Sequence, residues 1–285
     1  MTPLRQQMID AMRQRGFSPR THKSYLAAVR DCAKYFHQPP DQLQPAQLQR
    51  YFNYLVQERG LSGASCRLYL NALRFFYLQV LHWEQFDIPI QFPKRLQKIP
   101  DLLTRQEVKG IINAACNDKH RTLLLTCYGC GLRVSELVAL QVRHLDGERK
   151  LLRVEQGKGA KDRAVILSSG LLQALRAYWQ HQRSRHWLFP HSQKPDQPLS
   201  ITTPQKLYQR AKHHAGIDKV GGIHSLRHAY ATHQLENGMP VHQLQRQLGH
   251  RSLQSTLRYL HWVPGYEPGQ SSAIDLVGQL GLNDG

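Results

Sequence analysis

A dispersed set of basic residues precedes a tyrosine near the end of the chain, and together these groups could act on a phosphodiester. The set contains two arginines, a lysine, two histidines and the tyrosine: Arg133, Lys158, His224, Arg227, His250 and Tyr259. Arginine binds phosphate oxygens through a planar fork of N–H donors, and an activated tyrosine can form a covalent intermediate. These residue types suggest that the chain cuts and rejoins a nucleic-acid backbone without a metal.

The charge of the whole chain favours the same substrate. Its 285 residues include 38 Lys+Arg against 20 Asp+Glu, which gives a formal net charge of +18. A surface this basic attracts a polyanion, and DNA is the densest polyanion in a cell. Residues 1–98 contain 14 basic and 6 acidic residues, a net of +8, which leaves +10 for the remainder. Both parts could therefore face phosphate, although composition alone fits a basic ribosome-associated protein equally well.

Two motifs raise the alternative of a metal or redox site. Cys127 and Cys130 form a C-x-x-C motif, but no second pair accompanies them and they lie in an apolar run, so we interpret them as buried core. His224 and His228 share a helix face, but Arg227 lies between them and would repel a cation, and no third ligand is evident. We therefore expect neither a metal nor a cofactor.

The first 98 residues predict a bundle of helices. Ser18 followed by Pro19 is typical of a helix start, and Pro45 begins another helix. Apolar residues recur at helical spacing as far as about residue 81. The basic residues between them form a solvated face, part of which we expect to contact the DNA backbone: Arg20, Lys23, Arg67 and Arg74. In the second part of the chain, Lys161 is also expected to contact DNA.

Prolines at positions 89, 93 and 100 indicate an extended linker, so we place a domain boundary near Ile99. Beyond it, Thr104 and Glu107 form a capping box that predicts a helix start. Residues 151–154 and 164–167 predict a β-hairpin whose turn is rich in glycine and lysine.

The rest of the second part predicts helices at about residues 170–184, 203–215, 224–237 and 240–248, and a short helix after Ser252 that carries Tyr259. The expected fold class is mainly α: a helical N-terminal domain over 1–98, a mostly helical catalytic domain with one small antiparallel hairpin over 99–263, and a tail over 264–285.

In chain order, the motifs resemble those of the tyrosine recombinases, the phage integrase family. They are G-L-R-x-S-E-L at 131–137, G-K-G at 157–159, H-x-L-R-H at 224–228, L-G-H at 248–250 and T-x-x-Y at 256–259. The resemblance covers nearly the whole chain, and the N-terminal part is similar to the core-binding domain of that family. The two-domain size is similar to the bacterial Xer type and the integron integrases; the lack of a large insertion before His224 weighs against the integron subgroup.

The resemblance implies a role for each residue of the set. Tyr259 would attack the scissile phosphate and form a 3′-phosphotyrosyl link, while Arg133 and Arg227 would bind the non-bridging oxygens. His224 would assist proton transfer and His250 would hydrogen-bond the phosphate. The departing 5′ oxygen would be protonated by Lys158, because Gly157-Lys158-Gly159 matches the family better than the rival Lys161 does. Glu136 and His228 would orient the arginines.

The resemblance also implies double-stranded DNA as partner and a homotetramer on paired sites, with a monomer or dimer in free solution. The apolar face of the tail, formed by Ile274, Val277 and Leu280, would pass to a neighbouring protomer; alternatively the tail folds back on its own domain or frays. The charged N-terminus and the lack of a long apolar run predict a cytoplasmic protein with no membrane span. Two alternatives stay open: relaxation of DNA like that by type IB topoisomerases, and a catalytically silent DNA-binding protein.

Overall fold

Proline residues begin three of the helices in the N-terminal part of the chain. Helices α1 (Pro3–Gln14), α2 (Pro19–Phe36) and α3 (Pro45–Gln57) each start on a proline, which lacks the N–H that a first turn leaves unpaired. The Ser18 hydroxyl accepts a hydrogen bond from the Thr21 N–H, as the predicted cap requires. Helix α4 (Gly63–Gln79) begins in the same way at Ser62. The sequence patterns did not single out α1.

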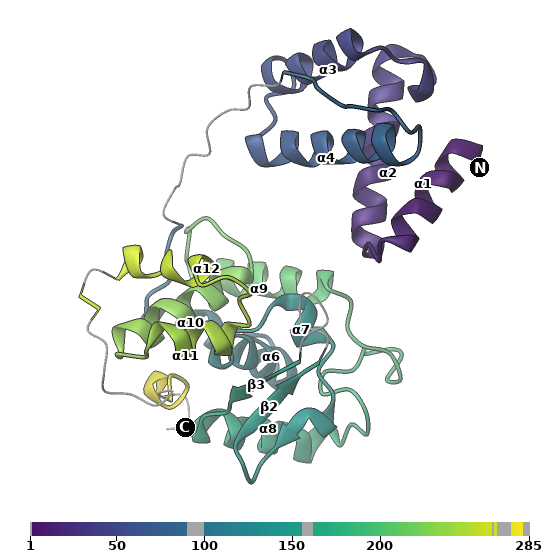
Figure 1. The fold of residues 1–285 in the computed structure, drawn as a ribbon. Coiled ribbons are helices and arrows are strands. Elements are labelled where there is room, and N and C mark those ends of the chain that lie inside the picture. The colour runs from purple at the N-terminus through teal and green to yellow at the C-terminus, as the bar shows by residue number, and fades with distance from the viewer. Residues whose placement is uncertain (1, 90–99, 156–161, 264, 267–274, 282–285) are drawn as a thin grey trace. The chain divides into compact units, whose positions relative to one another are not determined.

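Our structure is a computed structural model that describes residues 2–89, 100–155, 162–263, 265–266 and 275–281. The chain divides into two compact units, Met1–Lys98 and Ile99–Gly285 (Figure 1). In the first unit, α1 to α4 and the short 3-10 helix η1 (Pro40–Gln42) enclose a core rich in aromatic and sulfur-containing side chains, with α2 packed against α4. The predicted helical bundle is confirmed.

The second unit begins with three helices, and Arg133 lies at the start of the third. Thr104 and Glu107 form the predicted capping box at the start of α5 (Arg105–Asn113). Helix α6 (Asp118–Gly129) is buried over most of its length, and α7 (Val134–Val138) follows after a turn at Gly131. Arg133 is the N-cap of α7, so its side chain leaves the backbone where that helix starts.

A small antiparallel sheet follows α7. The short 3-10 helix η2 (Val142–His144) leads into β1 (Leu145–Asp146), which pairs with β2 (Leu151–Val154), and β2 pairs with β3 (Arg163–Ile166) in the register Leu151–Ile166 to Val154–Arg163. The predicted hairpin is therefore β2–β3, and the two-residue strand β1 adds a third strand that the sequence patterns did not reveal.

The remaining helices complete the second unit. They are α8 (Ser169–Gln182), α9 (Thr202–His214), α10 (His224–Glu236), α11 (Val241–Leu248) and α12 (Gln254–Leu257), followed by the 3-10 helices η3 (Leu260–Trp262) and η4 (Gly278–Leu280). The first four lie within two residues of the predicted ranges. The prediction for Tyr259 was wrong in detail, because Tyr259 follows α12 rather than lying on it.

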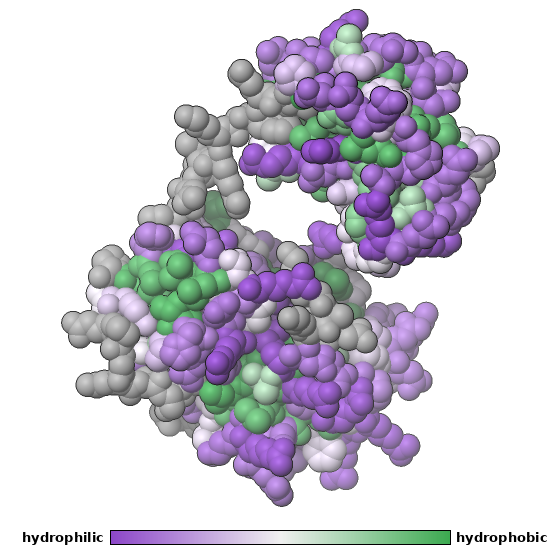
Figure 2. All heavy atoms as spheres, viewed as in Figure 1, coloured by the Kyte–Doolittle hydropathy of each residue, from purple (hydrophilic) through white to green (hydrophobic). Residues whose placement is uncertain are grey.

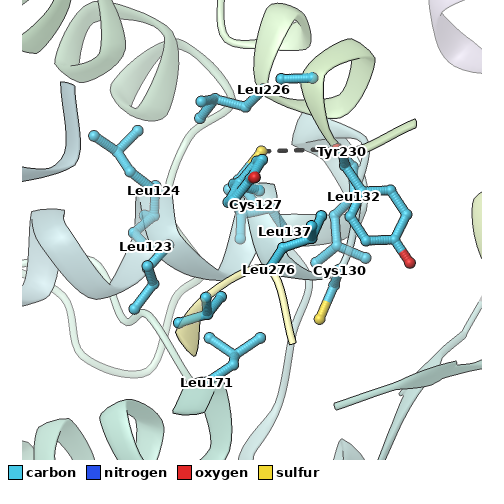
Figure 3. Packing of buried hydrophobic residues seen from close by; sticks show 14 of the residues in the cluster. Leu123, Leu124, Cys127, Cys130, Leu132, Leu137, Leu171, Leu226, Tyr230 and Leu276 are labelled. Atoms are coloured by element: carbon cyan, nitrogen blue, oxygen red, sulfur yellow. Dashed lines mark hydrogen bonds between the residues drawn. The ribbon is translucent and has the colours of Figure 1, made fainter. Parts of the chain in front are cut away.

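Cys127 and Cys130 lie in the core of the second unit. Both are buried among leucines of α6, α8 and α10 (Figure 3), and burial raises the pKa of Cys127 to about 12. The interpretation of this pair as core is confirmed. Polar and charged residues cover most of the visible surface of each unit (Figure 2). Within the described residues, no helix is long and apolar enough to cross a membrane.

Candidate active site

Four short segments of the second unit bring the predicted residues together. Arg133 comes from the start of α7, His224 and Arg227 from the first turn of α10, His250 from the turn after α11, and Tyr259 from the turn after α12. The two lysines of the β2–β3 turn, Lys158 and Lys161, lie outside the residues that the structure describes.

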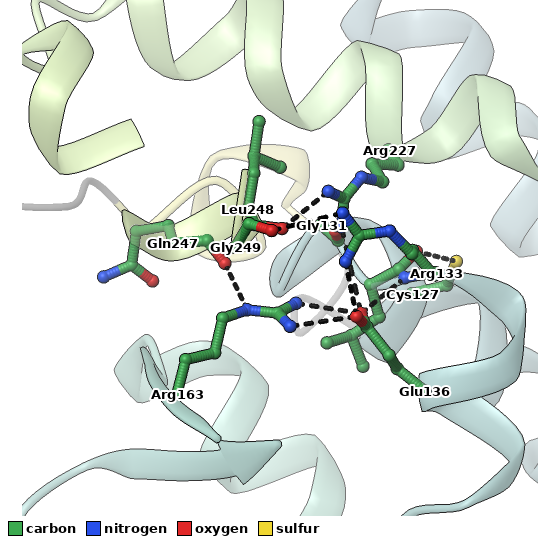
Figure 4. A network of polar contacts seen from close by, with 10 residues as sticks. Cys127, Gly131, Arg133, Glu136, Arg163, Arg227, Gln247, Leu248 and Gly249 are labelled. Atoms are coloured by element: carbon green, nitrogen blue, oxygen red, sulfur yellow. Dashed lines mark hydrogen bonds and ion pairs between the residues drawn. The ribbon is translucent and has the colours of Figure 1, made fainter. Parts of the chain in front are cut away.

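The Glu136 carboxylate accepts hydrogen bonds from Arg133 and Arg163 and lies close to Arg227 (Figure 4). Its carboxylate, with a side chain only 4% exposed, accepts hydrogen bonds from the backbone N–H and Nη1 of Arg133 at 2.9 and 2.7 Å. Arg163 binds both carboxylate oxygens in a fork, at 2.9 and 2.8 Å. Burial alone would raise the pKa of Glu136, but the hydrogen bonds and charges of Arg163 and Arg133 bring it down to about 2. Glu136 is therefore ionised, and it is hydrogen-bonded to both the backbone and the side chain of Arg133.

Arg227 is almost completely enclosed, with 1% of its surface exposed. Its guanidinium donates to the carbonyl oxygens of Gly131 at 2.7 Å and Leu248 at 2.6 Å, and lies 3.8 Å from Glu136. Burial and the nearby charge of Arg133 lower the pKa of Arg227 to about 10, which still leaves it charged at neutral pH. The side chain thus joins the turn before α7 to the end of α11.

Two glycines allow these carbonyls to approach the arginines. Gly131 and Gly249 have φ angles of +58° and +61°, in the left-handed region that glycine adopts without steric cost. A Cβ on Gly249 would lie 2.8 Å from Cδ of Arg163, and a Cβ on Gly131 would collide with the ring of Tyr230. The Gly249 carbonyl also accepts a hydrogen bond from Arg133 at 3.3 Å.

Three histidines near the arginines are held in the neutral form. Loss of solvent and the charges of Arg227 and Arg133 lower the pKa of His250 to about 3 and that of His224, which still reaches the protein surface, to about 4. Burial, followed by His224 and Arg258, lowers the pKa of His228 to about 3. Neutral imidazole can accept a proton at pH 7, which an imidazolium cannot.

Tyr259 lies beside these histidines and has no exposed surface. Its hydroxyl is 3.0 Å from Nδ1 of His228, and its ring is parallel to that of His250 with centroids 6.2 Å apart. Trp262 covers the ring edge-on at 5.0 Å, and the Arg258 guanidinium lies 5.3 Å from the ring centroid. The phenol is therefore next to the cluster of basic groups but closed off from a bulky substrate.

The structure differs from the sequence analysis at two residues of this cluster. His228 was expected to orient an arginine, but in the structure its ring is hydrogen-bonded to the Tyr259 hydroxyl, because the N-terminal part of α10 faces the turn after α12. Arg163, the first residue of β3, was not recognised at all. Its position directly after the glycine- and lysine-rich turn was the available signal, but its partner Glu136 is 27 residues away in sequence.

An open depression of about 630 Å³ adjoins the cluster at His224. Exposed polar and basic side chains of α9 line it, among them Lys206 and Arg210, together with Gly222 and Ile223 before α10. The four basic residues expected to contact DNA in the first unit are exposed on α2 and α4: Arg20, Lys23, Arg67 and Arg74.

Comparisons with known proteins identify the family of this chain. Residues 101–264 match the model of the phage integrase family, and residues 4–85 match that of the phage integrase N-terminal SAM-like domain. A relative from Sinorhizobium fredii, whose name describes an integrase/recombinase, is 39% identical over 279 residues, covering 97% of this chain and 90% of its own. The tyrosine recombinase XerA of Thermococcus onnurineus is 34% identical over 248 residues, covering 86% of this chain and 85% of its own.

The fold is also similar to that of a lambda integrase dimer bound to a core DNA site, with a TM-score of 0.71, 19% identity, and coverage of 88% of this chain and 95% of that one. At this level of identity the similarity concerns the fold alone. The family models and the sequence relatives, however, span both units and the whole cluster around Glu136 and Tyr259, and on that basis this chain belongs to the phage integrase family, the tyrosine recombinases.

Proposed function

We propose that this protein recombines DNA at specific sites and that Tyr259 is its nucleophile. The phenolic oxygen of Tyr259 attacks phosphorus, the bond from phosphorus to the 5′ oxygen breaks, and a 3′-phosphotyrosyl link remains. A 5′-hydroxyl from another strand then attacks this link and releases Tyr259. The phosphodiester energy is kept in the tyrosyl bond, so the two steps balance without a nucleotide.

The observation that carries this proposal is the position of the Tyr259 phenol. It lies against two neutral imidazoles, His228 and His250, and is close enough to the Arg227 guanidinium for the two side chains to interact electrostatically. A tyrosine in an ordinary core has no such partners. Here a potential nucleophile, proton acceptors and phosphate-binding cations lie close together, although they belong to four separate segments of the chain.

Arg133 and Arg227 are suited to bind the two non-bridging oxygens of the phosphate. Arg133 is 21% exposed, and its guanidinium has five N–H donors, more than its hydrogen bonds to Glu136 and Gly249 use. Arg227 is fixed by two carbonyls, so it contributes a charge in a defined place with little reorganisation. Their charges would stabilise the pentavalent transition state more than the ground state.

The phenol proton passes to a neutral imidazole, whose pKa, lowered here by burial and by nearby positive charges, rises when a bound phosphate offsets those charges. His228 forms the hydrogen bond to the hydroxyl in the structure, and the ring of His224, the acceptor implied by the family, lies 4.8 Å from the His228 ring between centroids. His250, held by Thr256 through Nδ1 at 2.8 Å, keeps Nε2 for a phosphate oxygen. By resemblance, Lys158 gives its proton to the departing 5′ oxygen, with Lys161 as the alternative donor.

The turn that carries Tyr259 must move before cleavage, because a phosphate cannot reach a phenol without exposed surface. Residues 258–262 are held by ring contacts, by the hydrogen bond from the Tyr259 side chain to His228 and by short-range backbone hydrogen bonds rather than by a long helix. A rearrangement of this short segment would expose the hydroxyl.

The DNA partner is double-stranded DNA held by both units: the N-terminal unit, over residues 1–98, as a core-binding domain and the second unit as the catalytic domain. Solved recombinases of the same fold are complexes with DNA. Leu276, Val277 and Leu280 of the tail pack into the core of the second unit of the same chain. We propose that the same segment can be donated to a neighbouring protomer in a tetramer on paired sites, and that the protein acts in the cytoplasm.

Strand joining between two duplexes tests this function. Two labelled duplexes that carry a recombination site should yield a product containing strands of both when incubated with the wild-type protein, and none with Tyr259→Phe. A protein that only relaxes supercoiled plasmid, without joining strands of different duplexes, would instead be a topoisomerase. A protein that binds the duplexes and changes neither would refute an enzymatic function.

A further inference from the structure

Arg163 makes a close set of contacts that none of the proposed catalytic roles requires. It is the first residue of β3, and its side chain is 10% exposed. Its Nη1 donates to Oε1 of Glu136 at 2.9 Å and its Nη2 to Oε2 at 2.8 Å (Figure 4). Its Nε donates to the carbonyl oxygen of Gln247 at 2.9 Å. A forked pair of this kind is among the strongest that side chains form.

The charges at this place explain what the pair does. Glu136 is a buried, ionised carboxylate that Arg133 and Arg163 share, and Arg227 is 3.8 Å away. Three positive charges meet one negative charge, so the cluster has a net charge of +2 for a phosphate. If Arg163 were neutral, the carboxylate would have Arg133 as its main partner, and the charge of Arg133 would be largely cancelled.

We propose that Arg163 is a positioning residue for strand cleavage: it neutralises Glu136, so that Arg133 and Arg227 keep their charge for the scissile phosphate. This inference rests on the proposed function. Arg163 itself does not touch the DNA, since all of its polar nitrogens are directed to Glu136 and Gln247.

A second consequence follows from the contact with α11. The Gln247 side chain also accepts a hydrogen bond from the Ile166 N–H at 3.0 Å, and Gly249 packs against the stem of Arg163. The end of α11 is therefore fixed to β3 at two points. That end supplies the Leu248 carbonyl that holds Arg227, and it is followed by His250.

A double-mutant cycle between Arg163 and Glu136 tests the inference. The rate of covalent complex formation is measured at saturating protein on a nicked duplex that traps the intermediate. Arg163→Met should slow this rate about 100-fold, the usual cost of losing one charge-stabilising donor. In a protein that already carries Glu136→Gln, the same Arg163→Met change should cost less than about threefold, because no carboxylate remains to capture Arg133.

An equal loss in both backgrounds would overturn the inference, because it is the result expected if Arg163 contacted the phosphate or only supported the fold. Arg163→Lys keeps the charge without the fork and should lose less than about tenfold; a loss as large as that of Arg163→Met would also overturn it. Melting temperature and DNA affinity show whether Arg163→Met folds. If it does not, Arg163→Lys is compared in the Glu136 and Glu136→Gln backgrounds instead. A similar loss of cleavage rate in both backgrounds would then count against the inference.

Arg153→Met on the neighbouring strand β2 is the matched control, since Arg153 is 64% exposed and pairs with Glu155 and Asp162. It should leave the cleavage rate within about twofold. The wild-type protein separates this inference from the proposed function. If wild type forms no covalent complex, the function itself is wrong; if it does, and the cycle shows no coupling, only the role of Arg163 is wrong.

Discussion

Replacing Glu136 by glutamine should remove a pH-dependent part of the stability of the second unit. The pKa of Glu136 is lowered from 4.5 to about 2 by its arginine partners, against the effect of burial. A pKa unit is worth about 1.36 kcal/mol, so this shift corresponds to roughly 3 kcal/mol at pH 7. Because the folded-state pKa is depressed, the contribution is complete above pH 4.5 and is lost as the pH falls through about 2. At pH 3 it has decreased by about 2 kcal/mol.

Urea unfolding of wild type and Glu136→Gln at pH 7 and pH 3 measures this contribution. Three of the four tryptophans lie in the second unit, at positions 179, 187 and 262, so their fluorescence follows its unfolding. Other carboxylates titrate equally in both proteins and cancel in the difference. The free-energy gap should be about 3 kcal/mol or more at pH 7 and about 2 kcal/mol smaller at pH 3. A gap that is the same at both pH values would refute the account of Glu136 as an ionised, arginine-bound carboxylate.

Three further changes have defined outcomes. Gly249→Ala places a Cβ on a residue in the left-handed conformation and against the Arg163 side chain, and it should lower the melting temperature by about 4 °C or more. Gly216 also has a positive φ but has open space around it, so Gly216→Ala should lower the melting temperature less. Exchanging Lys206 and Arg210 for glutamine should weaken DNA binding and reduce the slope of log Kd against log salt by about 1 for each lost phosphate contact; an unchanged slope would show that α9 does not face DNA. Val277→Asp puts a carboxylate into the core at a cost of about 2 kcal/mol or more, and hydrogen exchange should then become fast in residues 275–281 while α5 to α10 stay protected.

Most of the helices could be predicted because their signals are local. Pro19 with the Ser18 cap, and the Thr104–Glu107 capping box, begin helices at the expected residues. Strand β1 was not predicted because two residues carry no usable alternation, and it exists only through its pairing with β2.

The residue types of the candidate site were also readable from the sequence, because Arg133, His224, Arg227, His250 and Tyr259 occur in recognisable motifs. The contacts among them were not. The fork from Arg163 to Glu136 joins a strand to a helix 27 residues away, and no periodicity encodes such a pair. The bond between His228 and Tyr259, and the enclosure of the phenol by Trp262, depend on how the turn after α12 folds against α10.

The proposed mechanism requires Tyr259 to become covalently bonded to DNA, and identification of the bonded residue is the direct test. Wild-type protein is trapped on a nicked duplex, the adduct is digested with protease and nuclease, and the modified peptide is sequenced by mass spectrometry. We expect a single nucleotide-bearing peptide with the phosphate on Tyr259. A phosphate on any other residue, or an adduct that forms equally well with Tyr259→Phe, would contradict it.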